Sequence, residues 1–311
     1  MHVVGYSSVV QQIHHKINQW YRQNSRDLPW RREGVSGWEV MVSEFMLQQT
    51  PVVRVLPVWE EWMRRWPRPE DLAAEPLSEA LKAWGRLGYP RRAQRLHAAA
   101  IEITTEYNGE VPSTEEALRA LPGVGDYTAA AIACFAFGQP TVVVDTNIRR
   151  VHARLFGGMA LPEPSPRASE FARARQVQPE DQDSANLWNV SVMELGALVC
   201  TARSPKCEAC PVFEHCAWIA AGRPAPHYIP KGQAWKGTDR QVRGAIMAIL
   251  REHEKPLAQE SFLVDLAIQE HDTYVALERL QAELEQRERA LAGLLKDGLA
   301  VRDDEGIRLP S

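Results

Sequence analysis

The spacing of apolar residues along this chain is helical almost throughout. In residues 8–24 the positions Val9, Ile13, Ile17 and Trp20 recur every three or four residues, as on the buried face of an amphipathic helix. Similar patterns predict further helices over residues 38–49, 55–62, 77–84, 91–108, 114–119, 128–137, 148–156, 188–199 and 242–253. The sequence therefore predicts a mainly α protein.

A glycine-rich turn, Leu121-Pro-Gly123-Val-Gly125, separates two of these predicted helices. Two spaced glycines allow a tight backbone turn that a Cβ atom would obstruct. Ser113 and Glu116 have the spacing of a capping box for the helix before the turn. The turn predicts a helix–hairpin–helix unit whose backbone amides, next to a helix N-terminus, suit one DNA phosphate. A plain corner between two helices is the alternative.

The helix after the turn is apolar on all sides and is expected to be buried. It contains Cys134, which we interpret as a core residue. Gly138 stands directly after the helix, where a left-handed glycine commonly ends one.

Two carboxylates are in positions that suit proton donation or the stabilisation of a cation. Glu44 has Val40, Met41 and Leu47 on its own helical face, so we expect partial desolvation, a raised pKa and a proton donor. A glutamate on the helix surface is the alternative. Asp145 precedes a helix and fits an N-cap, and the same carboxylate can face a cation that develops on a sugar.

Two loops place an aromatic ring beside arginines. In the first loop, residues 28–32, we expect Trp30 to be exposed next to Arg31 and Arg32, and the second loop, residues 87–90, carries Tyr89. In the second loop, arginines with an aromatic tip suit phosphate pairing and insertion at a base step, and a solvated basic turn is the alternative. For the first loop the alternatives are the wall of a base pocket, or a tryptophan that covers the core edge beside solvated arginines. The arginines around the second loop are Arg86, Arg91, Arg92 and Arg95.

Four cysteines crowd into one short segment with the spacing C-x6-C-x2-C-x5-C. Clustered thiols of this kind indicate one inorganic centre, and an all-thiolate site suits a [4Fe-4S] cluster or zinc. Arg203 and Lys206, in the loop between the first two cysteines, either reach phosphate or are solvated. The four are Cys200, Cys207, Cys210 and Cys216.

Length and composition set the organisation. With 311 residues, 45% hydrophobic and 24% charged, the chain suits a globular protein of about two domains. The net charge of −4 excludes a generally basic coat, so a DNA-binding face must be local. No apolar run is long enough for a membrane span, and no secretory signal is visible.

We expect a catalytic domain over residues 1–221, with a cluster loop at about 200–216, and a Pro- and Gly-rich linker over 222–237. Residues 238–311 then form a small module of three helices and a hairpin at 299–309, which suggests a winged-helix-like fold.

These motifs together resemble the helix-hairpin-helix DNA glycosylases that carry an iron–sulfur cluster, and within them the adenine DNA glycosylases. The resemblance covers about residues 8–220 and implies the two-lobed fold of that superfamily with a [4Fe-4S] loop. Residues 238–311 do not resemble the β-rich domain that many members carry. The motifs are Ser43-Glu-Phe-Met-Leu-Gln48-Gln49-Thr50, Gly88-Tyr89, Leu121-Pro-Gly-Val-Gly125, Val144-Asp145-Thr-Asn147, Met193-Glu194-Leu-Gly-Ala197 and the four cysteines.

The resemblance assigns roles to individual residues. It implies that Glu44 protonates a ring nitrogen of a flipped-out adenine and that Asp145 stabilises the cationic sugar, which parallels glycoside cleavage. Positions that contact substrate or DNA in the family match Trp30, Arg31 and Glu194 in the adenine pocket, Gln49 and Tyr89 at the wedge, and Gln48, Thr50 and the hairpin residues Leu121, Gly123 and Gly125 along the DNA. Tyr127 and Asn147 match positions that support the catalytic carboxylates and water.

Tyr127 also decides a subclass. Bifunctional relatives carry a lysine there that forms a Schiff base, and a tyrosine cannot, so we expect a monofunctional glycosylase. The expected substrate is double-stranded DNA with adenine opposite 8-oxoguanine or guanine, acted on by a cytoplasmic, nucleoid-associated monomer. The alternatives are a thymine-mismatch or oxidised-pyrimidine glycosylase, and a non-catalytic, redox-sensing DNA-binding protein.

Overall fold

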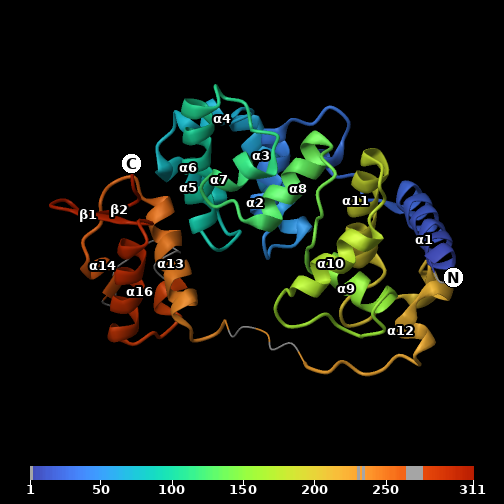
Figure 1. The fold of residues 1–311 in the computed structure, drawn as a ribbon. Coiled ribbons are helices and arrows are strands. Elements are labelled where there is room, and N and C mark those ends of the chain that lie inside the picture. Colours follow the sequence, from blue (N-terminus) through green and yellow to red (C-terminus); the bar gives the residue numbers. More distant parts are fainter. Residues whose placement is uncertain (1–2, 230–231, 233–234, 264–275) are drawn as a thin grey trace. The chain divides into compact units, whose positions relative to one another are not determined.

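The computed structural model describes residues 3–229, 232, 235–263 and 276–311. Helices make up nearly all of its regular structure, with one short antiparallel hairpin near the C-terminus (Figure 1). The prediction of a mainly α protein is therefore confirmed. The chain divides into two compact units, the first comprising residues 1–40, 112–120 and 124–231, and the second residues 41–111, 121–123 and 232–311. Helix α2 (Gly37–Leu47) runs across one of these boundaries.

The first unit is a helical assembly that ends in a cysteine-containing loop. Its buried core joins α1, α8, α9 and α11 through side chains such as Ile17, Ala131, Ile148, Trp188 and Leu195. Its elements are α1 (Val3–Asn24), η1 (Pro29–Arg31), α7 (Glu115–Ala120), α8 (Asp126–Phe137), α9 (Thr146–Leu155), α10 (Ala168–Val177), α11 (Gln182–Leu198), η2 (Cys207–Ala209), η3 (Phe213–His215) and α12 (Ala217–Ala220).

Helix α9 is unusual because it is buried on every side although it carries three arginines. Arg149, Arg150 and Arg154 are each almost inaccessible, as is His152. A buried guanidinium is tolerated only where its N–H groups find acceptors. For these arginines the acceptors include backbone carbonyls, the carboxylate of Glu170 on α10, the side-chain amide of Asn147 and the sulfur of Cys200. The helix therefore fixes the loops that surround it.

The second unit packs around tryptophans. Trp62 meets Trp66 and Trp84 edge to face, with ring centroids 4.9 and 5.5 Å apart, the geometry that aromatic quadrupoles favour. Its elements are α3 (Val52–Arg65), α4 (Pro69–Ala73), α5 (Leu77–Trp84), α6 (Arg91–Glu106), α13 (Asp239–Glu252), α14 (Glu260–Leu263), α16 (Leu284–Lys296), β1 (Val301–Asp303) and β2 (Gly306–Arg308).

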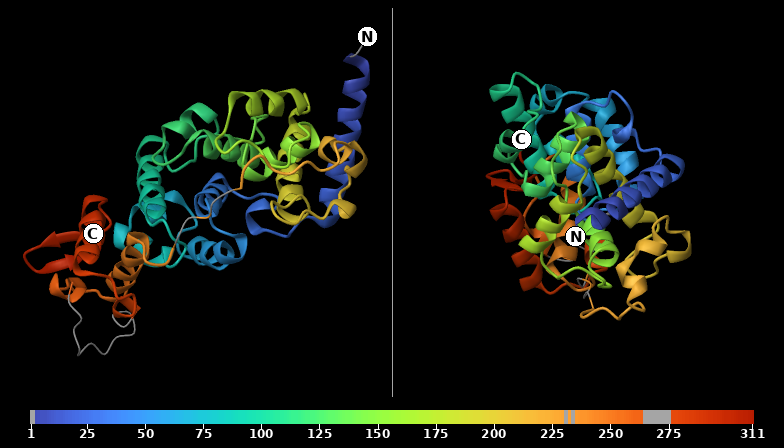
Figure 2. Two further views of the ribbon diagram at one scale, coloured as in Figure 1. Left: turned by 90° about the horizontal axis from the view of Figure 1, so that it is seen from below. Right: turned by 45° about the vertical axis from the view of Figure 1, so that its right-hand side comes forward.

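The C-terminal module, residues 238–311, belongs to this second unit and packs beside α5 and α6 (Figures 1 and 2). Within it α13 packs on α16, and β1 pairs with β2 in the register Val301↔Arg308. Leu257 adds an isolated bridge to Ile307. The predicted hairpin is confirmed, whereas the middle one of the three predicted helices falls largely on residues 264–275, outside the described residues.

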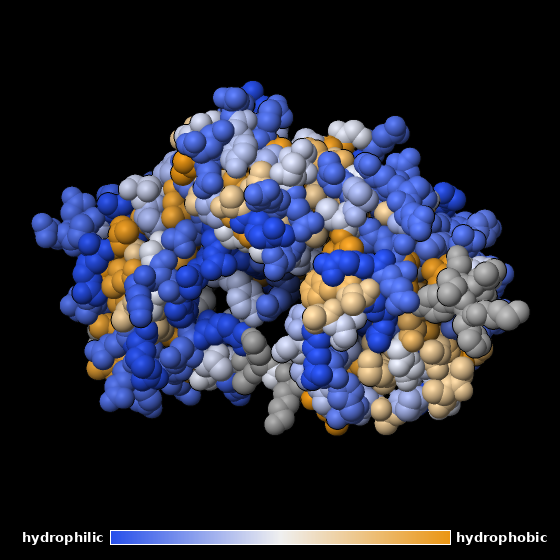
Figure 3. All heavy atoms as spheres, viewed as in Figure 1, coloured by the Kyte–Doolittle hydropathy of each residue, from blue (hydrophilic) through white to orange (hydrophobic). Residues whose placement is uncertain are grey.

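On the face drawn in Figure 3, hydrophilic side chains predominate and hydrophobic ones appear as small separate patches. Among the residues that the structure describes, no helix is both long and apolar enough to cross a membrane.

The helix–hairpin–helix unit is present, with one correction at its start. Helices α7 and α8 pack together on either side of the glycine-rich turn, and Gly138 ends α8 with a left-handed φ of 66°. The predicted capping box of Ser113 and Glu116 is wrong by one residue. The hydroxyl of Thr114 accepts the Ala117 N–H at 3.3 Å, because α7 begins at Glu115.

Candidate functional site

Asp145 is the N-cap of α9, and its carboxylate is held at both oxygens. Oδ1 accepts the Ile148 N–H at 2.6 Å, and Oδ2 accepts the side-chain amide of Asn147 at 2.8 Å. Burial raises the pKa of Asp145, and the bonds from Ile148 and Asn147 counteract that rise. The helix start thus presents a fixed, poorly solvated carboxylate, which is what stabilisation of a nearby cation requires.

A chain of hydrogen bonds continues from Asp145 to the cysteine loop. The amide oxygen of Asn147 accepts from Arg150 Nη2 at 2.8 Å, and Arg150 Nε donates to the carbonyl of Cys200 at 2.7 Å. Arg150 also donates to the carbonyl of Gly196, at 2.7 Å. A Cβ on Gly196 would stand 2.7 Å from the Cβ of Asn147, so glycine permits α11 to approach the start of α9 this closely. Arg150 was not identified from the sequence.

Glu44 lies on α2, within the second unit. Its side chain is 5% exposed, on a helix whose Val40, Met41 and Val42 are also buried. The expected desolvation of this carboxyl is confirmed. Asp145 belongs to the first unit.

Glu194, on α11, is fully buried and paired with two arginines. Arg26 donates through its backbone N–H at 3.0 Å and through Nε and Nη2 at 2.7 Å each, and Arg31 Nη1 donates at 2.8 Å. Burial alone would raise the pKa of Glu194, but the hydrogen bonds from Arg26 and the charge of Arg31 outweigh it and lower the pKa to about 2. Glu194 is therefore a permanent anion, and Arg26 is a partner that the sequence did not reveal.

Trp30 does not have the exposed position expected of it. The segment Pro29–Arg31 forms a 3₁₀ turn, and the Trp30 ring is buried. The physical reason is the ion pair of the next residue, Arg31, with Glu194, which draws the turn onto α11.

Two turns predicted to contact DNA are joined by one buried side chain. Arg92 donates to the carbonyls of Met46 and Gln48 at 2.8 and 2.6 Å, and to that of Gly88 at 2.9 Å. Its Nη2 also donates to the hydroxyl of Thr50 at 2.9 Å. The expectation that Arg92 lies on a basic surface around Tyr89 is therefore wrong, because its guanidinium satisfies carbonyls left unpaired where α2 ends.

At the tips of these two turns the backbone is left-handed at residues other than glycine. Gln49 has φ of 57° and Tyr89 has φ of 49°. Such backbone costs of order 1 kcal/mol and persists where surrounding contacts hold it. Both side chains reach the surface, with Gln49 exposed and Tyr89 43% exposed.

The glycine-rich turn uses its two glycines differently. Gly123 has φ of 79°, and a Cβ there would stand 2.6 Å from the Cβ of Arg95. Gly125 has an ordinary φ of −96°, is the N-cap of α8, and has nothing within 4 Å of its absent Cβ. The first glycine permits close packing and the second keeps the approach to the α8 amides open. Leu121 anchors the turn in the core, and Tyr127 is half-buried in the first turn of α8.

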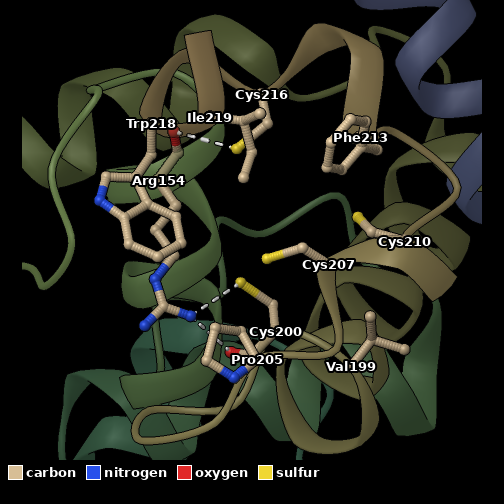
Figure 4. A pocket seen from close by; sticks show the side chains of 10 residues that line it. All are labelled: Arg154, Val199, Cys200, Pro205, Cys207, Cys210, Phe213, Cys216, Trp218 and Ile219. Atoms are coloured by element: carbon tan, nitrogen blue, oxygen red, sulfur yellow. Dashed lines mark hydrogen bonds between the residues drawn. The ribbon is translucent and has the colours of Figure 1, made fainter. Parts of the chain in front are cut away.

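The four clustered cysteines line one cavity (Figure 4). Their sulfur atoms point into it, and Val199, Phe213 and Ile219 contribute apolar walls. Arg154 Nη1 donates to Cys200 Sγ at 3.3 Å and to the Thr201 carbonyl at 2.8 Å, while its guanidinium lies 4.8 Å from the Trp218 ring.

This cavity fits a cluster better than a single ion. Across the described ranges, no three or more His, Cys, Asp or Glu side chains are arranged to hold one metal ion. A zinc ion needs its sulfurs at about 2.3 Å, whereas a cubane offers separate iron corners to a wider ring of thiolates. Burial, assisted by the neighbouring thiols, raises the pKa of Cys210 to about 12, and burial also raises that of Cys216. A thiolate at this depth would therefore need a compensating positive charge close by.

Arg203 and Lys206 are exposed on the loop between Cys200 and Cys207. Cys134 is buried in α8, as expected of a core residue, and contacts Asn186 and Asn189.

Comparison with known proteins gives consistent matches. Residues 42–179 match the family described as HhH-GPD superfamily base excision DNA repair protein, and residues 200–216 match the iron-sulfur binding domain of endonuclease III. The adenine DNA glycosylase of Mycobacterium tuberculosis (strain H37Rv) is 46% identical over 292 residues, which is 92% of this chain and 90% of that protein. This match covers more residues than 1–237 contain, so it reaches into the C-terminal module.

Two further matches are shorter. The human adenine DNA glycosylase is 43% identical over 205 residues, covering 63% of this chain and 37% of that protein. Among solved structures, a thermostable thymine-DNA glycosylase superposes with a TM-score of 0.62 at 27% identity, covering 70% of this chain and 99% of that one.

Proposed function

This chain belongs to the adenine DNA glycosylase family, within the HhH-GPD superfamily of base excision DNA repair proteins, and we propose that it removes adenine mispaired with 8-oxoguanine or guanine. The observation that carries the proposal is the carboxylate of Asp145, fixed at the start of α9 by Ile148 and Asn147 in a chain so similar to adenine glycosylases. The reaction is hydrolysis of the bond between base and sugar, and it leaves an abasic site.

In the proposed mechanism Glu44, buried on α2, gives a proton to a ring nitrogen of the flipped adenine, so that the base leaves as a neutral molecule. The anionic Asp145 stabilises the oxocarbenium-like sugar while water completes the hydrolysis. Asn147 holds Asp145 through Oδ2, and Tyr127 supports the site from α8. Because Tyr127 has no amine, no Schiff base forms, and the enzyme is monofunctional.

DNA binding is shared among several surfaces in this proposal. Gln49 and Tyr89 wedge into the duplex from two turns that Arg92 joins through Gln48, Thr50 and Gly88. Leu121, Gly123 and Gly125 form the hairpin that offers α8 amides to a phosphate, and Arg203 and Lys206 reach the backbone from the cluster loop. The adenine pocket is built from Trp30 and Arg31, with Glu194 holding Arg31 in place.

The chain carries a [4Fe-4S] cluster, and we propose that Cys200, Cys207, Cys210 and Cys216 are its ligands. When bound, the cluster supplies iron–thiolate bonds that cross-link the loop between α11 and α12. Arg150 and Arg154 hold the Cys200 end of this loop through its carbonyl and sulfur.

We further propose that residues 1–221 carry the catalysis, that 222–237 connect, and that 238–311 form a winged-helix-like accessory module. The protein acts as a monomer on double-stranded DNA, in the cytoplasm at the nucleoid.

A duplex panel tests the proposal. The purified protein is incubated with duplexes containing adenine opposite 8-oxoguanine or guanine, thymine opposite guanine, and an oxidised pyrimidine, and strand breaks are measured with and without alkali. We expect breaks only at adenine and only after alkali. Base release from thymine or oxidised pyrimidine instead would support the thymine-glycosylase alternative, which the structural likeness to a thymine-DNA glycosylase favours.

One variant and one trapping experiment test the proposed roles of Glu44 and Tyr127. Glu44→Gln should lower the single-turnover rate by at least about a hundredfold, as expected when a general acid is lost, while duplex affinity stays near that of the wild type. Wild-type rates in this variant would rule out Glu44 as the acid. Efficient borohydride trapping of a protein–DNA adduct would contradict the monofunctional assignment.

A further inference from the structure

The turn that carries Tyr89 has a fixed backbone and an outward side chain. It lies between α5 and α6, and the Gly88 carbonyl in it accepts from the Trp84 indole at 3.0 Å and from Arg92 at 2.9 Å. The Arg92 guanidinium also lies 5.6 Å from the Tyr89 ring. These contacts hold the turn from beneath, where it meets the core of the second unit.

The C-terminal module reaches the other end of this side chain. Arg240, in the first turn of α13, donates from Nη1 to the Tyr89 hydroxyl at 3.2 Å. Its guanidinium also lies 5.6 Å from the ring of Trp235, which is 55% exposed. A residue 151 positions away in the chain thus contacts the tip of the ring that is proposed to enter DNA.

The module is anchored on both helices that flank the turn, independently of Tyr89. Arg251 donates to the Leu81 carbonyl on α5 at 3.1 Å. On α6, Gln94 donates to the carbonyls of Asp297 and Gly298 at 3.3 and 3.2 Å. The carboxylate of Asp297 pairs with Arg243 within the module and lies 3.7 Å from Arg91 on α6. These contacts set where Arg240 stands relative to the turn.

We propose that Arg240 is a positioning residue for the DNA wedge: through the Tyr89 hydroxyl it holds the ring in the orientation that enters the opened base step. The C-terminal module thereby takes part in capturing the duplex, although Arg240 itself does not bind phosphate. The inference rests on the proposed function, in which Tyr89 is the wedge. Without this hydrogen bond the exposed ring samples other rotamers, and DNA binding has to restrict it again.

A double-mutant cycle in the full-length protein tests the inference. The variants are Arg240→Ala, Tyr89→Phe, which keeps the ring and removes the hydroxyl, and the pair combined. The control is Arg308→Ala, which removes an equal charge from the same module at an ion pair with Asp303 in the hairpin. The measurements are the dissociation constant for a duplex with a non-hydrolysable adenosine analogue opposite 8-oxoguanine, its salt dependence, and the fluorescence of 2-aminopurine beside the wedge site.

We expect each single variant to weaken binding about three- to tenfold, because the Tyr89 side chain then loses conformational freedom when it binds DNA. The double variant should bind the duplex with about the same affinity as the single variant that binds it less tightly. The control should bind like the wild type. The 2-aminopurine signal should fall in both single variants, because the ring enters the stack less often. The slope of affinity against salt should not change, because no phosphate contact is lost.

Multiplicative effects of the two substitutions would overturn the inference, as would a salt slope that drops by about one in Arg240→Ala, which marks a direct phosphate contact. Failure of the proposed function gives a different result. In that case the wild type releases no adenine from any duplex, while the cycle in binding affinity still decides how Arg240 acts.

Discussion

Arginines that bind buried acceptors organise this protein at the scale of single residues. Arg92 collects the carbonyls of two turns, Arg150 joins Asn147 to Cys200, and Arg26 neutralises Glu194. A guanidinium presents several N–H donors in a fixed plane, so one side chain can satisfy acceptors from separate loops. Removing any of them leaves buried acceptors without a donor, which is costly in free energy.

Arg26 gives the clearest prediction of this kind. Arg26→Ala removes the bidentate partner of a fully buried carboxylate and should lower the free energy of unfolding by about 3 kcal/mol, measured by urea denaturation without oxygen. Arg32→Ala is the matched control, because its partner Asp27 and its own side chain are largely exposed. The control should change stability by less than about 0.5 kcal/mol. Equal losses in both variants would contradict the role given to Glu194.

His152 makes stability depend on pH. Burial, and after it the charge of Arg173, lower its pKa to about 3, from an ordinary value of 6.5. Between these two pH values the His152 imidazole is protonated in the unfolded chain and neutral in the folded protein. The free energy of unfolding therefore decreases as the pH falls below 6.5 towards 3. Between about pH 7 and pH 5.5 the free energy of unfolding should fall by about 1 kcal/mol from this group alone.

The measurement compares urea midpoints at the two pH values in the wild type and in His152→Phe, where the phenyl ring keeps the stacking on Trp188. The variant should lose this part of the pH dependence. His15→Gln, at an exposed position, should retain it. A slope remains from His14, whose pKa burial also lowers.

At the scale of elements, local patterns predicted helices well where the ends carry their own signals. The structure has α5 over Leu77–Trp84, the range expected from the sequence, and Gly138 ends α8 as expected. The start of α7 and the depth of Trp30 differed, since one depends on a choice between adjacent hydroxyls and the other on an ion pair with a residue far along the chain.

The candidate site was predictable to the same extent. Asp145, Glu44 and the cysteines occupy positions with distinctive neighbours in the sequence. The partners Arg26, Arg150 and Arg154 have none, because their acceptors lie up to 168 residues away. The spacing of Arg150 and Arg154, four residues apart in α9, was a signal that they share a face, but it does not tell which loop that face meets.

Substitution of the two glycines of the hairpin should have different effects, one on stability and the other on duplex binding. Gly123→Ala should destabilise the fold by about 1–3 kcal/mol, because φ is positive and the new Cβ would clash with Arg95. Gly125→Ala should leave stability within about 1 kcal/mol but weaken duplex binding, because its Cβ would occupy the open approach to the α8 amides. Thermal unfolding and the duplex dissociation constant, measured on both variants, check the pair. Undiminished binding by a folded Gly125→Ala protein would refute the phosphate site.

At the scale of the whole molecule, the net negative charge is opposite in sign to what binding to DNA requires. The chain carries a net charge of −4 yet belongs to a family of DNA repair enzymes, so its attraction to DNA must come from local groups. In the proposed function, exposed cations such as Arg203 and Lys206, together with helix N-termini, supply such groups.

Duplex affinity should therefore fall steeply with salt, despite the acidic total. From about 50 mM to about 200 mM salt we expect a loss of roughly tenfold or more, which corresponds to about two or more neutralised phosphates. Fluorescence anisotropy with a labelled duplex measures this dependence. The double variant Arg203→Ala, Lys206→Ala should have a shallower slope, and Arg308→Ala should not. An affinity indifferent to salt would exclude the phosphate contacts assigned to the loop.

The route of the chain through the two units has a consequence for synthesis. Because the chain passes from one unit to the other after residues 40, 111, 120, 123 and 231, neither unit is encoded by a continuous stretch. A nascent chain on the ribosome cannot complete the first unit before residue 231 emerges, and the second stays unfinished until the final module follows. The first unit can therefore fold and take up its cluster while residues 232–311 are still being added, whereas the second unit is completed last. A premature stop within residues 232–311 is expected to damage the unit that holds Glu44.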